Sequence, residues 1–157
     1  MKYLQLFKHI ASQITKDYSI HIGPLNSEID YITDGYIVWL IPNYKNPFKY
    51  MRVLDNFDKV INDINYSRLE KVNKFITLND ENLFDGKTMA RGTIKGNEFY
   101  FNPEFLKHFD KKCELFKDDF KETAKIYIKE SSEIVGFILP IYVNDETKEK
   151  INNKLGL

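Results

Sequence analysis

The feature that most constrains the fold is a change of hydrophobic period within residues 97–112, which read NEFYFNPEFLKHFDKK. In the first half, Phe99 and Phe101 alternate with polar neighbours, which is the pattern of a β-strand. After Asn102 and Pro103 the apolar residues recur at helical spacing. Asn is a good N-cap residue for a helix. Proline is tolerated in the first turn because the N–H that it lacks would have no acceptor within the helix. The stretch therefore predicts a strand that passes directly into a capped helix.

The N-terminal half predicts two more helices and a hairpin. Residues 2–16 place apolar side chains on one face of an amphipathic helix, and residues 53–64 predict a second one. Residues 27–42 read as two strands around a tight turn at Asp34 and Gly35, because glycine tolerates the positive φ that such turns need.

The remaining segments are mostly extended. Residues 71–78 and 87–101 predict two or three strands, and residues 116–143 predict a strand, a serine turn and a long apolar final strand. The expected fold class is α+β, with antiparallel sheets backed by two to three helices. One domain is expected over residues 1–143. Residues 144–157 form a charged tail with few apolar anchors, which is expected to fray or to form a loose helix.

The charge balance limits the classes of function. Basic and acidic residues both number 23, so the bulk charge supports neither a protein that coats DNA or anionic membranes nor an acidic mimic of nucleic acid. The N-terminus lacks a signal-peptide core, and no apolar run approaches the roughly 20 residues of a membrane span. A cytoplasmic protein is expected, with no membrane partner. The abundance of Ile, Lys, Asn, Tyr and Phe fits a low-GC bacterium or its phage.

Residues that could carry catalysis do not form a known motif. His9, His21 and His108 lie on separate predicted elements, outside any metal-ligand spacing, and are expected at the surface or its boundary. Cys113 is the single cysteine, so an intramolecular disulfide or a Cys-X-X-Cys pair is excluded, and a half-buried structural thiol is expected.

Scattered carboxylates leave one enzymatic alternative open. A divalent-metal nuclease or another Mg²⁺ enzyme would need such groups, although charged surface loops look the same. The pairs are Glu28/Asp30, Asp80/Glu81 and Asp118/Asp119. The expectation from the residues is a non-enzymatic protein with no catalytic residue, no metal and no cofactor.

Two stretches together resemble the bacterial DNA sliding clamp, the beta subunit of the replicative polymerase. The first comprises residues 99–114 and 124–143, in which a strand enters a helix at Asn-Pro and the chain finishes on an apolar strand that contains proline. The second is IDYITDGYIVWLIP, residues 29–42, which is similar to the hairpin that follows the first helix of a clamp domain. The resemblance implies one clamp-like domain that packs two helices on one face of antiparallel sheets.

The resemblance also implies a protein-binding edge. Clamp partners dock short peptides into an apolar pocket beside the final strand. The residues at the matching positions are Phe137, Leu139, Pro140, Ile141 and Tyr142, where Tyr142 stands in place of the usual arginine. A protein partner is therefore expected to bind these residues.

A clamp's helices carry basic residues toward DNA phosphates, and Lys107, Lys111 and Lys112 are the corresponding candidates for DNA binding. The function implied is that of a non-enzymatic clamp-like protein, encoded by a phage or mobile element, that acts in DNA replication through protein binding. The same resemblance allows DNA contact and a homo-oligomer. The alternative is a small phage inhibitor of a host defence complex, of the anti-CRISPR type.

Overall fold

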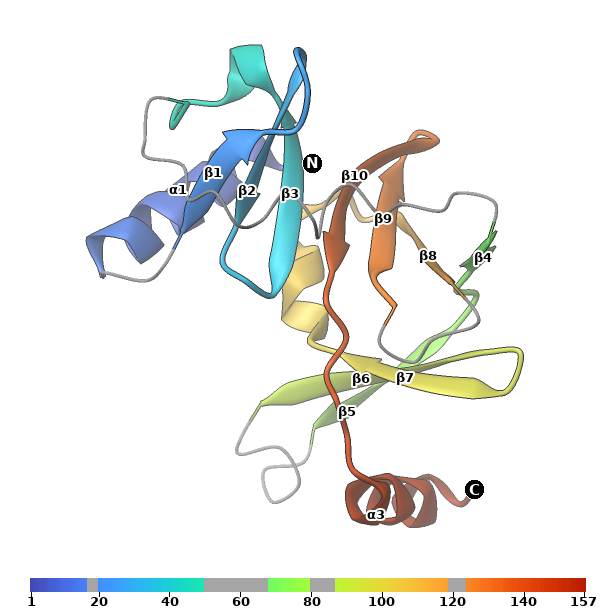
Figure 1. Cartoon of the computed structure of the whole chain (residues 1–157). Coiled ribbons are helices and arrows are strands. Elements are labelled where there is room, and N and C mark those ends of the chain that lie inside the picture. The colour runs from blue at the N-terminus through green and yellow to red at the C-terminus, as the bar shows by residue number, and fades with distance from the viewer. Residues whose placement is uncertain (17–19, 50–67, 80–86, 119–123) are drawn as a thin grey trace.

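Seven strands form the larger of two antiparallel sheets in the part of the chain that the structure, a computed structural model, describes (Figure 1). That part comprises residues 1–16, 20–49, 68–79, 87–118 and 124–157. The strands of the large sheet are, in spatial order, β1 (His21–Pro24), β2 (Ile29–Thr33), β3 (Ile37–Pro42), β10 (Glu133–Ile138), β9 (Ile126–Glu130), β8 (Glu114–Asp118) and β4 (Leu69–Lys71). The predicted α+β class with antiparallel sheets is confirmed.

The N-terminal elements follow the sequence pattern. The helix α1 (Tyr3–Thr15) buries Leu6 and Ile10, which lie on its apolar face. The hairpin β2–β3 turns where the sequence predicts it, because the Asp34 carboxylate accepts the N–H groups of Tyr36 and Ile37 at 2.9 and 3.1 Å. These two predictions are confirmed, whereas the predicted helix over residues 53–64 lies outside the described residues.

The smaller sheet contains three strands, with β6 in the middle. They are β5 (Phe75–Asn79), β6 (Thr88–Ile94) and β7 (Asn97–Phe101). The prediction of two or three strands in residues 71–78 and 87–101 is confirmed by these three strands, whereas Lys71 ends β4, which belongs to the large sheet. The N–H of Val72 donates to the carbonyl of Leu115 at 2.8 Å, which holds the end of β4 on β8 before the chain crosses to the small sheet.

The junction after β7 is built as predicted, but its helix is shorter. The side chain of Asn102 accepts the N–H of Glu104 at 3.0 Å, and proline occupies the first turn. The element is one short 3-10 helix, η3 (Pro103–His108), in place of a longer α-helix. It ends because the backbone becomes extended at Phe109, whose ring is buried in the core.

One core joins the two sheets. Aromatic residues from β7 and from the end of η3 pack with α1 and with one face of the large sheet, with Trp39 fully buried among them. The α1 helix and η3 contact each other, and both contribute to this core. The buried members include Leu6, Ile10, Ile37, Trp39, Phe99, Phe101, Phe109, Leu115, Ile126 and Ile138. The two sheets, α1 and η3 therefore share one core.

The last predicted strand ends early. The strand β10 stops at Ile138, and residues 139–143, here named the strap, continue in extended form from the large sheet toward the small one (Figure 1). The N–H of Leu139 donates to the carbonyl of Tyr36 at 2.8 Å, and the N–H of Ile141 donates to the carbonyl of Tyr100 at 2.7 Å. The strap is thus bonded in turn to the β2–β3 turn and to β7.

The C-terminal tail forms a regular helix, which corrects the expectation of a frayed or loose segment. The helix α3 (Asp145–Leu155) begins at Asn144, whose side chain accepts the N–H of Thr147 at 2.9 Å. It ends at Gly156, whose positive φ of 72° suits glycine. Ile151 is buried against the small sheet, so the tail has one strong apolar anchor.

Candidate protein-binding groove

A groove of about 710 Å³ lies beside the strap. Its walls come from five places: the strap itself, the β2–β3 turn, the start of β6, the start of η3 and the N-terminal end of α3. The lining residues are Tyr36, Lys87, Thr88, Met89, Asn102, Phe105, Leu139, Pro140, Ile141, Tyr142, Val143, Asn144 and Thr147. The side chains are mostly apolar or aromatic, as in sites that bind small ligands or peptide side chains.

Four of the five predicted protein-binding residues line this groove. Leu139, Pro140 and Ile141 are half-buried, and Tyr142 is 77% exposed. The assignment of Phe137 to the binding surface is corrected, because its side chain is fully buried and its ring centroid lies 5.9 Å from that of Tyr127. Phe137 therefore supports the sheet from which the strap leaves.

The backbone of the strap leaves one side free to bond. Because Leu139 and Ile141 direct their N–H groups to the protein, the intervening residues of an extended chain direct theirs the other way. Pro140 has no N–H, and the N–H of Tyr142 has no backbone acceptor among the described residues. The carbonyl of Pro140 and the N–H of Tyr142 therefore form a short outer edge to which another extended chain could add.

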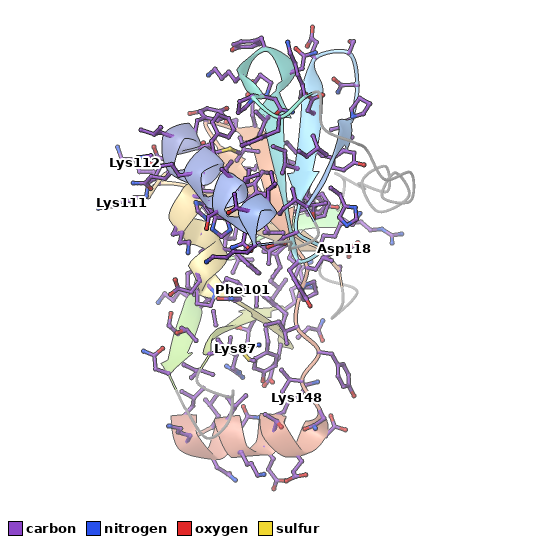
Figure 2. The ribbon with its side chains drawn as sticks, turned by 90° about the vertical axis from the view of Figure 1, so that its left-hand side faces the viewer. Lys87, Phe101, Lys111, Lys112, Asp118 and Lys148 are labelled. Carbon is purple, nitrogen blue, oxygen red and sulfur yellow. The ribbon has the colours of Figure 1, made fainter. Side chains whose placement is uncertain are left out.

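The groove carries one charged lining residue in the part of the chain that the structure describes. Lys87 precedes β6, and Figure 2 shows it at the level of the small sheet, above α3. The other lining side chains are uncharged. The electrostatics of the groove therefore favour an apolar ligand that carries an acidic group near Lys87.

The predicted DNA-binding lysines lie on a different surface. Lys107, Lys111 and Lys112 are exposed, and Figure 2 shows Lys111 and Lys112 projecting beside α1. Lys2 joins them, because its ammonium group donates to the carbonyl of Lys107 at 3.2 Å. Asp110 lies within this group and accepts the N–H of Lys112 at 2.9 Å. The structure thus gathers the lysines, with an acidic residue between them.

Two of the histidines lie together, which the sequence analysis missed. The ring centroids of His9, on α1, and His108, on η3, are 4.7 Å apart, and both rings lie against Trp39. The expectation of a surface or boundary position is wrong for His108, which is 5% exposed. Burial, followed by the charges of His9, Lys107 and Lys2, lowers the pKa of His108 to about 4. The residue is therefore neutral at physiological pH.

The other candidate catalytic groups do not converge. Cys113 is half-buried, and burial together with Glu130 and Asp110 raises the pKa of its thiol, which fits a structural role. Asp30 accepts a hydrogen bond from the side chain of Asn46 at 2.9 Å. Within the described ranges, no three His, Cys, Asp or Glu residues lie close enough together to hold a metal ion.

Asp80, Glu81 and Asp119, which belong to the remaining carboxylate pairs, lie outside the described residues.

Comparisons of the chain with protein-family models, with curated proteins and with solved structures gave no match. Among the described residues, no helix combines the length and the apolar character that a membrane crossing requires.

Proposed function

We propose that this chain is a non-enzymatic, clamp-like binding protein of a phage or mobile element that acts in DNA replication, and that it docks an extended peptide of a protein partner in the groove beside the strap. The observation that carries the proposal is the position of the groove. Leu139, Pro140, Ile141 and Tyr142 match the peptide-binding edge of a clamp by resemblance, and they line an apolar hollow in the fold.

The geometry supports binding by β-strand addition. A bound peptide would accept the N–H of Tyr142 and donate to the carbonyl of Pro140, while alternate side chains enter the groove. Main-chain bonds of this kind give affinity, and the pocket gives specificity. The uncharged residues of the lining select apolar side chains of the peptide, and Lys87, the charged lining residue, selects an acidic side chain next to them.

Replacing Tyr142 by alanine is expected to weaken peptide binding about tenfold, because truncating an aromatic residue at the centre of an interface typically costs more than 1 kcal/mol. The probes are peptides selected from a random display library against the wild-type protein, with affinities measured by fluorescence anisotropy. Tyr44→Ala is the matched control, because Tyr44 is also 77% exposed and lies outside this groove. Selected peptides that bind Tyr142→Ala and wild type equally would contradict the proposal.

DNA is the second proposed partner, bound through the lysines of η3 and the turn that follows it. Neutralising Lys107, Lys111 and Lys112 together is expected to reduce the slope of log K against log salt by about 3, because each phosphate contact contributes roughly 0.9. The measurement is a salt titration with a short duplex of mixed sequence. The control replaces three exposed lysines on other segments with alanine, namely Lys49, Lys95 and Lys150. Equal losses in the two triple variants would mean that only the bulk charge matters.

A further inference from the structure

The helix α3 is held on the small sheet by a limited apolar contact. Ile151 is the only residue of this fully described helix that is buried, and it packs in one cluster with Leu78, Met89 and Tyr100. Leu155 adds a partly buried side chain to the same cluster. Figure 1 shows α3 on the side of the small sheet that faces away from the large sheet. The contact is therefore separate from the main core.

Polar groups at this contact affect the docking in opposite directions. On the sheet, Glu98 accepts a hydrogen bond from Arg91 at 2.6 Å and another from Tyr100 at 2.8 Å. Burial raises the pKa of Glu98, but these two bonds and the charges of Arg91 and Lys148 lower it overall, so Lys148 of α3 attracts this carboxylate. The side-chain carbonyl of Asn152 is buried, and no described residue donates a hydrogen bond to it, which weakens the docked state.

The ends of α3 are satisfied by residues of the helix itself and its flanks. Asn144 caps the first turn, and the N–H of Leu157 donates to the carbonyl of Asn152 at 2.9 Å beyond the left-handed Gly156. Lys150 and Glu146 form an i,i+4 ion pair at 2.6 Å on the exposed face. None of these bonds is made to the sheet. The Ile151 cluster and the attraction of Lys148 to Glu98 connect the helix to the sheet.

The position of α3 also determines the shape of the groove. Asn144 and Thr147, at its N-terminal end, line the groove. Met89 takes part in both places, because it lines the groove and packs in the Ile151 cluster. A movement of α3 away from the small sheet would remove one wall of the groove and uncover the apolar side chains beneath the helix.

We infer that α3 is a hinged cover, which opens as a unit at the end of the strap near Asn144 while the large sheet and its core stay folded. The link to binding rests on the proposed function of the groove, whereas the hinge itself does not. A peptide seated against Thr147 binds the closed form better and therefore holds α3 on the sheet. The position of α3 would therefore regulate the affinity of the groove for the peptide.

Hydrogen exchange on the full chain without a ligand tests the hinge. The amides of α3 are expected to exchange faster than those of β3, β9 and β10, at rates that rise less steeply with urea than those of the strands, because the opening exposes less surface than global unfolding does. Ile151→Ala is expected to accelerate exchange in α3 at least tenfold. The contact is lost both in the open form and in the unfolded chain, so the three central strands can accelerate as well, but α3 should still exchange faster than they do. Asn152→Leu is expected to slow exchange in α3, because it removes the unpaired carbonyl. Asn153→Ala, at an exposed neighbouring position, is the control and should change these rates less than threefold.

The inference is overturned if α3 and β10 exchange at the same rate in both the wild type and Ile151→Ala, since α3 would then open only when the whole protein unfolds. It is also overturned if Asn153→Ala accelerates exchange in α3 as much as Ile151→Ala does. A hinge that behaves as expected, combined with a failure of any selected peptide to bind the groove, would refute the proposed function and leave the hinge standing.

Discussion

Replacing Gly136 by alanine is expected to lower the free energy of unfolding by about 3 kcal/mol, at the upper end of the range for overpacking a core. A Cβ atom at this position would lie 2.4 Å from the carbonyl oxygen of Val38 and 3.0 Å from Cζ of Phe109. The nearer obstacle is the backbone of β3, the partner of β10, so it cannot turn away as a flexible side chain does. Urea denaturation monitored by the fluorescence of Trp39, the single tryptophan, measures the loss.

Gly35→Ala provides the control for this prediction. Gly35 has a φ of +94°, and a Cβ atom added there would meet nothing within 4 Å, so alanine introduces backbone strain of about 1 kcal/mol and no clash. Adding Phe109→Leu to Gly136→Ala should not restore stability, because the carbonyl of Val38 remains in place. A loss at Gly136 no larger than that at Gly35 would contradict the close approach of β3 and β10.

The close approach at Gly136 also matters for the groove. Gly136 lies next to a register irregularity in the pairing of β10 with β9, two residues before the strand ends at Ile138. The strap begins at the next residue, and its first N–H is bonded to Tyr36 beside β3. Tight packing of β10 on β3 therefore sets where the strap starts and in which direction it leaves the sheet.

Local signals account for the parts of the fold that the sequence predicted. The apolar stripe of α1, the Asp34 turn and the Asn102–Pro103 junction each depend on residues that are close in the chain. The signals for α3 are also local, since Asn144 and Gly156 are good residues for the start and end of a helix. These two signals were given too little weight, because the segment between them contains few apolar residues and was therefore expected to fray or to form a loose helix.

Other features depend on tertiary packing and could not be read from a pattern. The extended run from residue 69 to 79 is divided between two sheets, and an apolar run looks the same whether it lies in a sheet or crosses between sheets. Pro140 was a signal for the early end of β10, because it cannot donate to a ladder. Met89 and Thr147 reach the groove from elements whose positions the sequence leaves open. The predicted strap residues came from a family resemblance, and Phe137 was misplaced because that resemblance does not show where β10 ends: Phe137 pairs with both β3 and β9 inside the sheet, whereas the strap begins after Ile138.

The pairing of His9 with His108 leads to the second large prediction. Lowering the pH from 7.5 to 5 is expected to reduce the free energy of unfolding by about 2 kcal/mol through His108 alone. The pKa of His108 is lowered from 6.5 to about 4, chiefly by burial. Below pH 6.5 the unfolded chain binds a proton that the folded chain excludes, so stability falls until the pH reaches the folded pKa. Burial and the charge of Lys107 lower the pKa of His9 as well, while Asp34 opposes this, so His9 acts in the same direction.

Urea denaturation at a series of pH values, on wild type and on His108→Gln, measures this effect. Glutamine does not titrate, so the variant should lose much less stability between pH 7.5 and 5, whatever its stability at neutral pH. The pKa of the Glu98 carboxylate is lowered from 4.5 in the folded state. Its contribution to the free energy of unfolding is therefore lost mainly below pH 4.5, outside the range from pH 7.5 to 5 that tests His108. An NMR titration of the folded protein gives an independent check. Parallel stability curves for the two proteins, or an imidazole of His108 that titrates near pH 6.5 in the folded state, would show that the ring is not held neutral by its packing against Trp39 and α1.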